Sequence, residues 1–259
     1  MNIPIRMIGL ATTFVWIFLV VFLVSAVYSV RDSQFDLGKP QVSVTMENKL
    51  LVSLPINIVN NGYYDIGAFN LTTEILDADG FMIRRDSTFL RIISRGGKVT
   101  ALHDVTLNFD DLLDSSEDYL FNDTDLTVAA FAGMRIAEFI PVQVSTNFSL
   151  PWGGPLYNFT LGEPERAGFN LTHFRVTVPM SFENHAFFDV IGNIQVQMYS
   201  SSDLLVGDNR TSIEAPQHSM YNGRVEFHVP ITELTSRGRF NVYFQTSFFE
   251  CGPLVIHYG

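Results

Sequence analysis

The stretch LVSLPINIVNNGYYDI at residues 51–66 decides the fold, because the stretch FRVTVPMSFENHAFFDV at residues 174–190 repeats its pattern. In both, an alternating apolar run contains a proline and ends at an asparagine, Asn60 or Asn184, followed by an aromatic pair and an aspartate. The elements that follow also agree in order, down to a closing strand at the end of each copy. We therefore predict a duplicated unit.

Strict alternation of apolar and polar residues is the main secondary-structure signal after residue 30. It runs through residues 174–183, 69–75 and 225–229, and a period of two is typical of a strand with one buried face. Polar turns are expected at residues 77–80 and 207–209. Short antiparallel strands of this kind predict an all-β body built from two tandem immunoglobulin- or fibronectin-like β-sandwiches.

A Pro/Gly-rich segment, LPWGGP at residues 150–155, marks the join between the two copies. Trp152 either pins the two domains together or packs against the nearer one. The expected divisions are a cytoplasmic stub with a transmembrane helix, a first sandwich, a linker and a second sandwich, at residues 1–30, 31–147, 148–168 and 169–259.

The N-terminal segment between Arg6 and Arg31 carries no charge over residues 7–30. As a helix these residues would extend about 36 Å, enough to cross a hydrocarbon core of about 30 Å. The rival interpretation is a cleaved signal peptide with a cleavage site near Ala26, but an apolar region of this length favours a retained anchor. We predict a single-pass protein of the cell membrane.

Its orientation follows from two signals. Positive-inside counting places the N-terminus in the cytoplasm by about one charge, and acceptor motifs for N-glycosylation are more frequent than chance predicts. The alternative is that Asn, Ser and Thr are simply common in turns. The predicted glycosylation sites are Asn70, Asn122, Asn147, Asn158, Asn170 and Asn209.

Composition excludes several classes of function. The net charge of −11 repels nucleic acid, and the single cysteine, Cys251, rules out an internal disulfide framework. The six histidines lack the spacing of a zinc motif, and nucleophile-elbow and phosphate-loop motifs are absent. We therefore expect no catalytic residue, no metal ligand and no cofactor, and Cys251 is interpreted as a half-buried structural thiol rather than as a partner of His257.

An acidic segment at residues 110–125 is the densest polar feature. Its carboxylates could bind Ca²⁺, which takes six to eight oxygen ligands. It lacks the glycine of an EF-hand loop, and the matching part of the second copy, residues 232–235, lacks most of the acids. A solvated acidic loop is the simpler interpretation.

The repeated pattern resembles the late-embryogenesis-abundant type 2 family, also known as the water-stress and hypersensitive-response domain. The resemblance rests on residues 56–66 and, less fully, on residues 180–190. It covers about residues 40–145 and 169–259. It implies a β-sandwich of about a hundred residues, often behind one N-terminal membrane helix, and no catalytic residues.

Two functions follow from these features. The first is a membrane-anchored, extracytoplasmic, non-enzymatic protein of the cell envelope that acts as a structural or protein-interaction module, with a protein partner or self-association. The second is a lipid-binding or lipid-transfer protein, because some sandwiches of that family hold an acyl chain. An apolar cavity of about 300–1,000 Å³ opening toward the membrane would distinguish the second from the first.

Overall fold

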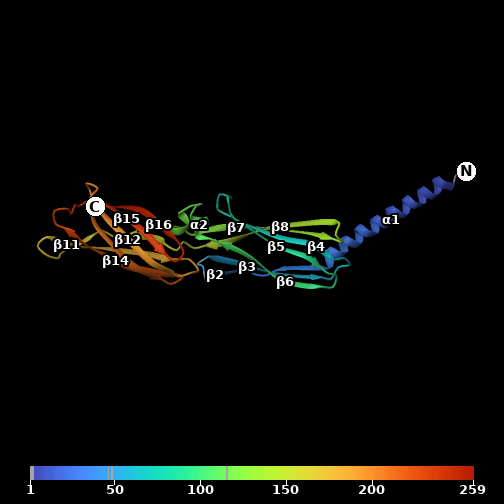
Figure 1. The fold of residues 1–259 in the computed structure, drawn as a ribbon, viewed down its shortest axis with the longest axis horizontal. Helices are drawn as coiled ribbons and strands as arrows, with labels where there is room; N and C mark the ends of the chain where they lie inside the picture. The colour runs from blue at the N-terminus through green and yellow to red at the C-terminus, as the bar shows by residue number, and fades with distance from the viewer. Residues whose placement is uncertain (1–2, 46, 48, 115) are drawn as a thin grey trace.

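A computed structural model describes residues 3–259 apart from 46, 48 and 115, with side chains described from residue 12 onward. Helix α1 (Ile3–Asp32) precedes a body made mostly of β-strands. The molecule is elongated, with α1 projecting from one end and the C-terminal strands at the other (Figure 1). The predicted all-β body with one N-terminal apolar helix is thus confirmed.

The N-terminal unit, residues 33–152, has two sheets of four strands each in its described part. In one sheet β3 pairs with β6 on one side and with β1 and β2 on the other, and the second sheet has the order β5-β4-β7-β8. Two short helices follow β6. The elements are β1 (Ser33–Leu37), β2 (Gln41–Val44), β3 (Leu50–Asn60), β4 (Ile66–Leu76), β5 (Met82–Ile93), β6 (Lys98–Leu107), α2 (Phe109–Leu113), α3 (Asp118–Phe121), β7 (Thr124–Ile136) and β8 (Ile140–Trp152).

The C-terminal unit, residues 157–258, repeats this arrangement. Strand β11 pairs with β14 and with β9 and β10, and the second sheet has the order β13-β12-β15-β16. Strands β11 to β16 therefore correspond one by one to β3 to β8, as the sequence repeat predicted. The elements are β9 (Tyr157–Leu161), β10 (Glu165–Gly168), β11 (His173–Asn184), β12 (Val190–Ser200), β13 (Leu205–Ala215), β14 (Ser219–Pro230), β15 (Gly238–Thr246) and β16 (Glu250–Tyr258).

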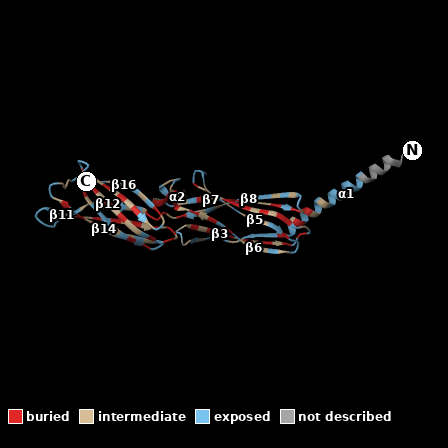
Figure 2. Ribbon diagram, in the orientation of Figure 1, coloured by how far each residue is buried: buried red, intermediate tan, exposed pale blue. Residues whose placement is uncertain are grey.

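Alternation places one side of each central strand in the core. Along β3, every second residue from Leu50 to Asn60 is buried, and in β11 the side chains of Val176, Val178 and Phe182 are almost fully buried. Burying a large apolar side chain contributes about 1.5–3 kcal/mol, so this periodicity fixes which face of each strand points inward. Figure 2 shows buried residues along the inside of both units.

One predicted turn is found and the other is displaced. Residues 77–80 connect β4 to β5, and the carboxylate of Asp77 accepts the backbone N–H groups of Asp79 and Phe81. Residues 207–209 instead lie inside β13. A side chain on Gly207 would lie 2.8 Å from the Phe227 ring, so this glycine permits close approach of β13 to β14 rather than a turn.

The segment expected as a linker, residues 148–168, differs from the expectation because it holds the end of β8 and the whole of β9 and β10. Pro151 is accommodated in β8 because this strand lies at the edge of its sheet and pairs only with β7. Proline has no backbone N–H to donate to a neighbouring strand, and an edge strand has no neighbour on its solvent side.

The base of α1 is fixed to the turn between β3 and β4. Tyr64 lies edge-on to Phe22, with ring centroids 5.6 Å apart, and its hydroxyl shares a 2.8 Å hydrogen bond with Ser25. Its backbone N–H donates to Ser29, whose side chain is 1% exposed. Gly62 lies so close that an added Cβ would be 2.2 Å from the Ser29 hydroxyl oxygen. The helix therefore leaves the unit in a defined direction.

Candidate functional site at the junction of the two β units

The acidic segment folds into the short helices α2 and α3, which bring apolar side chains to the junction of the two units. Phe109, Leu112 and Leu120 are each at most 3% exposed. The acidic side chains alternate with these positions, so the residues that looked like a polar loop cover one end of a core. In the described part of the chain no group of three or more His, Cys, Asp or Glu side chains is arranged to hold a metal ion.

An aromatic cluster joins the units across this junction. The ring of Phe109 lies 5.0 Å from Phe188 and 5.8 Å from Trp152, and Trp152 lies edge-on to Phe187 at 5.9 Å. The indole N–H of Trp152 donates to the Tyr119 carbonyl at 2.8 Å. Trp152 therefore contacts both units, which answers the two alternatives that the sequence left open.

The buried core is continuous through this cluster: one group of packed apolar residues includes members of both units, from Leu50 to Tyr258. The Pro/Gly-rich join therefore lies within a shared core and does not separate two independent cores. Gly154 in the join and Leu156 just after it are both buried, and Leu156 donates its backbone N–H to the Leu120 carbonyl at 2.8 Å. Proline and glycine here permit close packing rather than separation.

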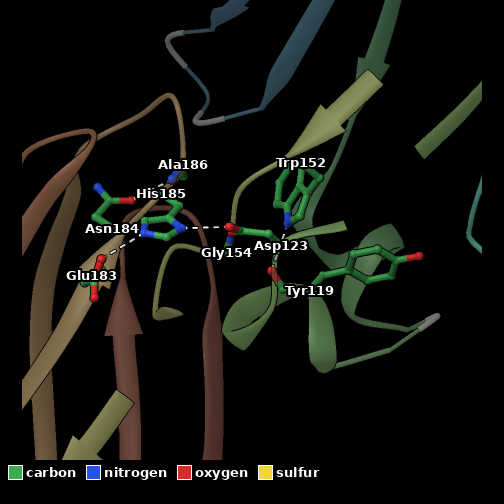
Figure 3. A network of polar contacts seen from close by, with 8 residues as sticks. All are labelled: Tyr119, Asp123, Trp152, Gly154, Glu183, Asn184, His185 and Ala186. Atoms are coloured by element: carbon green, nitrogen blue, oxygen red, sulfur yellow. Dashed lines mark hydrogen bonds and ion pairs between the residues drawn. The ribbon is translucent and has the colours of Figure 1, made fainter. Parts of the chain in front are cut away.

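His185 is the polar centre of the junction (Figure 3). Its Nδ1 lies 2.8 Å from the Asp123 carboxylate of the other unit, and its Nε2 lies 3.0 Å from Glu183. Tyr157 stacks on the imidazole at 4.2 Å. The backbone continues the link, because Gly154 donates to Asp123 and His185 donates to the Gly154 carbonyl, at 3.0 and 3.1 Å.

The hydrogen bonds to Asp123 and then to Glu183 raise the pKa of His185 above its usual value. Each carboxylate favours the imidazolium, whose two N–H groups can both donate. With both ring nitrogens engaged, the protonated imidazole forms an ionic clamp between the units. Sequence reasoning missed it because Asp123 and His185 lie 62 residues apart, and only the position of His185 beside the repeated Asn184 hinted at a special turn.

A cleft of about 760 Å³ lies beside the clamp. Its walls combine apolar residues with carboxylates and imidazoles, namely Val42, Leu150, Trp152, Phe187, Asp123, Asp125, His185 and His218. It lies at the end of the N-terminal unit remote from α1, because Thr124 pairs with Trp152 there and Ile136 pairs with Ile140 at the helix end. It is therefore not the membrane-facing cavity that lipid handling would require.

The predicted glycosylation sites are spread along both units rather than gathered at the junction. Five of the six asparagines are exposed, and Asn70 is half-buried with its amide 3.2 Å from the Thr72 hydroxyl. Asn209 lies in β13 rather than in the predicted hairpin turn. The exposed ones are Asn122, Asn147, Asn158, Asn170 and Asn209.

Cys251 lies half-buried in β16. Burial, with a smaller contribution from the Glu117 carboxylate, raises the pKa of its thiol to about 11. A thiol with this pKa stays protonated near neutral pH and is a poor nucleophile. This agrees with the structural role expected from the sequence.

Comparison with known proteins identifies no family for this chain. No family model and no curated protein matches the chain. Among solved structures it is similar to the transglutaminase of red sea bream, with a TM-score of 0.33 and 12% identity, over 88% of this chain and 31% of that chain. The chain thus spans about a third of the length of that protein. The neighbour is an enzyme, which contradicts the expectation that this chain is not one, and we withdraw that expectation. At this TM-score the likeness carries no activity to the present chain.

Proposed function

We propose that the protein is a membrane-anchored, extracytoplasmic module of the cell envelope that holds two linked β units away from the bilayer for a structural or protein-interaction role. The observation that carries this proposal is the exposed apolar surface of α1. Phe14, Trp16 and Phe18 are each more than 60% exposed, and residues 12–32 form the candidate membrane span among the described residues. Such a surface is covered by lipid in a spanning helix.

The connections within the molecule support a spacer role. The base of α1 is locked to the N-terminal unit through Tyr64 and Ser29, and the His185 clamp with its aromatic cluster locks the next junction. The type of fold is also that implied by the resemblance to the water-stress domain family, which remains part of the proposal.

The distal end of the C-terminal unit supports an interaction role. Leu171, in the turn between β10 and β11, is 98% exposed, and Phe169 beside it is 47% exposed. Ile231 lies at the same end, since its backbone N–H donates to the Thr172 carbonyl. Clustered exposed apolar side chains are frequent at protein–protein interaction sites.

Topology is tested first. Protease added to intact cells should degrade the protein beyond Arg31 and leave the membrane segment protected, and alkaline extraction should leave the full chain in the membrane fraction. The matched control replaces Phe18 and Val20 by Lys, because each charge at a helix centre costs about 2.5–3.5 kcal/mol of insertion. A parent chain that is protected from protease, or extracted as readily as the control, contradicts the proposal.

The interaction role is tested separately by photocrosslinking in intact cells. A photoreactive residue in place of Leu171 should give a discrete crosslinked species, and the same residue in place of Ser149, exposed on β8, should not. Equal patterns at both positions would remove the support that the distal end gives.

A further inference from the structure

The depth of α1 in a bilayer is limited by its contacts with the N-terminal unit. The apolar run begins after Arg6, and 20 helical residues, about 30 Å, fill a hydrocarbon core. Counted from residue 7, this length ends at Ala26, which is 3% exposed because the unit already covers it. Tyr64 reaches further along the helix, to Phe22. The turn at residues 61–65 therefore lies at the level of the hydrocarbon boundary.

Three more segments reach the same level, and we call the four together the membrane-facing end: residues 31–33, 61–65, 94–98 and 135–139. Hydrogen bonds tie them to one another, because the Asp65 carboxylate accepts the Arg95 backbone N–H at 2.7 Å and the Asp65 carbonyl accepts that of Ala137 at 3.2 Å. In Figure 1 the β7–β8 connection lies beside the base of α1.

The exposed side chains of the membrane-facing end suit a lipid interface. Phe139 is 80% exposed at the tip of the β7–β8 turn, and Tyr63 is 59% exposed in the β3–β4 turn. Tyr28, 50% exposed on α1, lies at the same level. Tyrosine is enriched at the level of lipid headgroups, because its ring has an apolar body and a polar tip. An exposed phenylalanine such as Phe139 is typical of the slightly deeper boundary between headgroups and acyl chains.

The charges of this end differ from those of the rest of the chain. The four segments hold four basic and three acidic residues, whereas the whole chain holds 16 basic and 27 acidic ones. The bases Arg31, Arg95, Lys98 and Arg135 are all exposed. None of the six glycosylation motifs falls in these segments. The end that faces the bilayer is thus nearly balanced in charge and free of predicted glycan, although the chain as a whole is acidic.

We propose that the membrane-facing end is a lipid-binding surface, seated in the headgroup layer of the leaflet from which α1 emerges, with Phe139 and Tyr63 inserted among the headgroups. The interfacial layer is about 5–8 Å thick on each side of the bilayer. A layer of this depth can hold the tips of loops but not whole strands. The ligand is the zwitterionic phospholipid headgroup with the first acyl carbons below it. The inference rests on the proposed membrane anchoring of α1.

The test uses tryptophan emission of the full chain in phosphatidylcholine vesicles whose acyl chains carry bromine near the headgroup or near the bilayer centre. Trp16 reports the depth of α1. For the loops, Trp16→Phe is the background, since its remaining Trp152 is 3% exposed and far from lipid. Phe139→Trp and, separately, Tyr63→Trp are added to this background. Leu171→Trp at the distal end, 98% exposed, is the matched control.

The added emission of Phe139→Trp and of Tyr63→Trp should be quenched by bromine near the headgroup and less by bromine near the centre, and that of Leu171→Trp by neither. If Trp16 is quenched but both loop tryptophans behave like Leu171→Trp, the lipid-binding surface is overturned and the membrane anchoring of α1 still stands. An unquenched Trp16 would overturn both. Stronger quenching in vesicles with added phosphatidylglycerol would show that the surface prefers anionic headgroups. This result would overturn the choice of the zwitterionic headgroup as the ligand.

Discussion

Asn60 and Asn184 occupy the same position in the two β units and close the same turn with the same hydrogen bonds. Each is fully buried. The Asn60 amide donates to the carbonyls four and 33 residues ahead, both at 3.0 Å, and that of Asn184 to the carbonyls four and 31 residues ahead, both at 2.9 Å. Each Oδ1 accepts the N–H two residues ahead. The repeated asparagine is therefore a structural residue that replaces missing backbone hydrogen bonds.

The first prediction concerns this residue. Asn184→Ala removes the donor for the buried carbonyls of Phe188 and Ala215, and each unsatisfied buried polar group costs about 1–3 kcal/mol. We expect the free energy of unfolding to fall by at least about 2 kcal/mol in chemical denaturation. The control is Asn57→Ala, on β3, whose side chain only accepts from the Thr100 hydroxyl at the surface. Equal losses for both variants would contradict the structural role.

The same turn has a second use, which differs between the units. After Asn60 it receives the base of α1, and after Asn184 it receives the N-terminal unit through His185 and Phe188. In each case the turn connects its unit to the element that precedes it in the chain. The molecule therefore extends in one direction by repeating a single junction design.

Gly62→Ala tests the first of these junctions. Its Cβ would lie 2.2 Å from the Ser29 hydroxyl oxygen and 2.4 Å from the Ser29 carbonyl oxygen, so the helix must shift from its seat. We expect faster amide hydrogen exchange at residues 29–33 and 61–65, with little change in the C-terminal unit. Gly133→Ala, where a Cβ meets nothing within 4 Å, should leave exchange unchanged. Unchanged exchange in Gly62→Ala would mean that the helix is not fixed there.

Much of the fold followed from the sequence because it depends on local periodicity. Alternation identified β11 and β14, and the repeat predicted that strands β11 to β16 follow the order of β3 to β8. The predicted turn at residues 207–209 failed because Gly207 serves a contact between strands, which no local pattern encodes. The linker was mistaken for an irregular segment because Pro151 is tolerated at a sheet edge, and edge position is a property of the assembled sheet.

The junction site could not be predicted for a different reason. Asp123 belongs to the acidic segment, and Phe109 directly precedes that segment. The buried face of this region appears only when the short helices form, and the partners His185 and Phe188 come from the other unit. Long-range pairing of this kind leaves no signal in composition or spacing. Trp152 was singled out correctly as a candidate for pinning the units, because a large aromatic residue in a Pro/Gly-rich segment needs a packing partner.

Glycosylation gives a third prediction, which follows from the proposed extracytoplasmic placement of the two units. The exposed sites, such as Asn158 and Asn147, leave room for a glycan, whereas the Asn70 side chain is half-buried and hydrogen-bonded. Protein from its native source should lose mass on enzymatic removal of N-glycans, and Asn158→Gln should remove one increment. Asn70→Gln should reduce the glycan mass least, because Asn70 is the least accessible of the six sites. A native protein whose mass does not change on enzymatic removal of N-glycans would contradict the prediction.

The junction should respond to pH. Because the folded pKa of His185 is raised, its ionic clamp contributes fully below the unfolded value of about 6.5 and is lost as the pH rises through the higher folded pKa. We expect faster exchange at residues 118–123 and 183–188 at alkaline pH, after correction for intrinsic rates. His185→Gln should abolish this difference. His103, whose pKa is lowered by burial, acts with the opposite sign and is present in both proteins, so it cancels in the comparison.

The last prediction asks whether the two units unfold together. Phe109 is 3% exposed and contacts Trp152 of its own unit and Phe188 of the other. Replacing a buried phenylalanine by alanine costs about 3–5 kcal/mol, and here the cavity would open in a core that both units share. Phe109→Ala should therefore speed hydrogen exchange in β7 and in β12 alike. Phe69→Ala is the matched control, since Phe69 belongs to a separate cluster near α1.

The control should speed exchange in the N-terminal unit and leave β12 unchanged. If Phe109→Ala also leaves β12 unchanged, the C-terminal unit is stable by itself and the two units are not coupled. Calorimetry adds a second reading of the same question. Coupled units give one transition that Phe109→Ala lowers or splits, whereas independent units give two transitions of which only the N-terminal one moves. A spacer that transmits the direction of α1 to the distal end requires the first result, because a hinge at residues 150–156 would uncouple that end from the membrane.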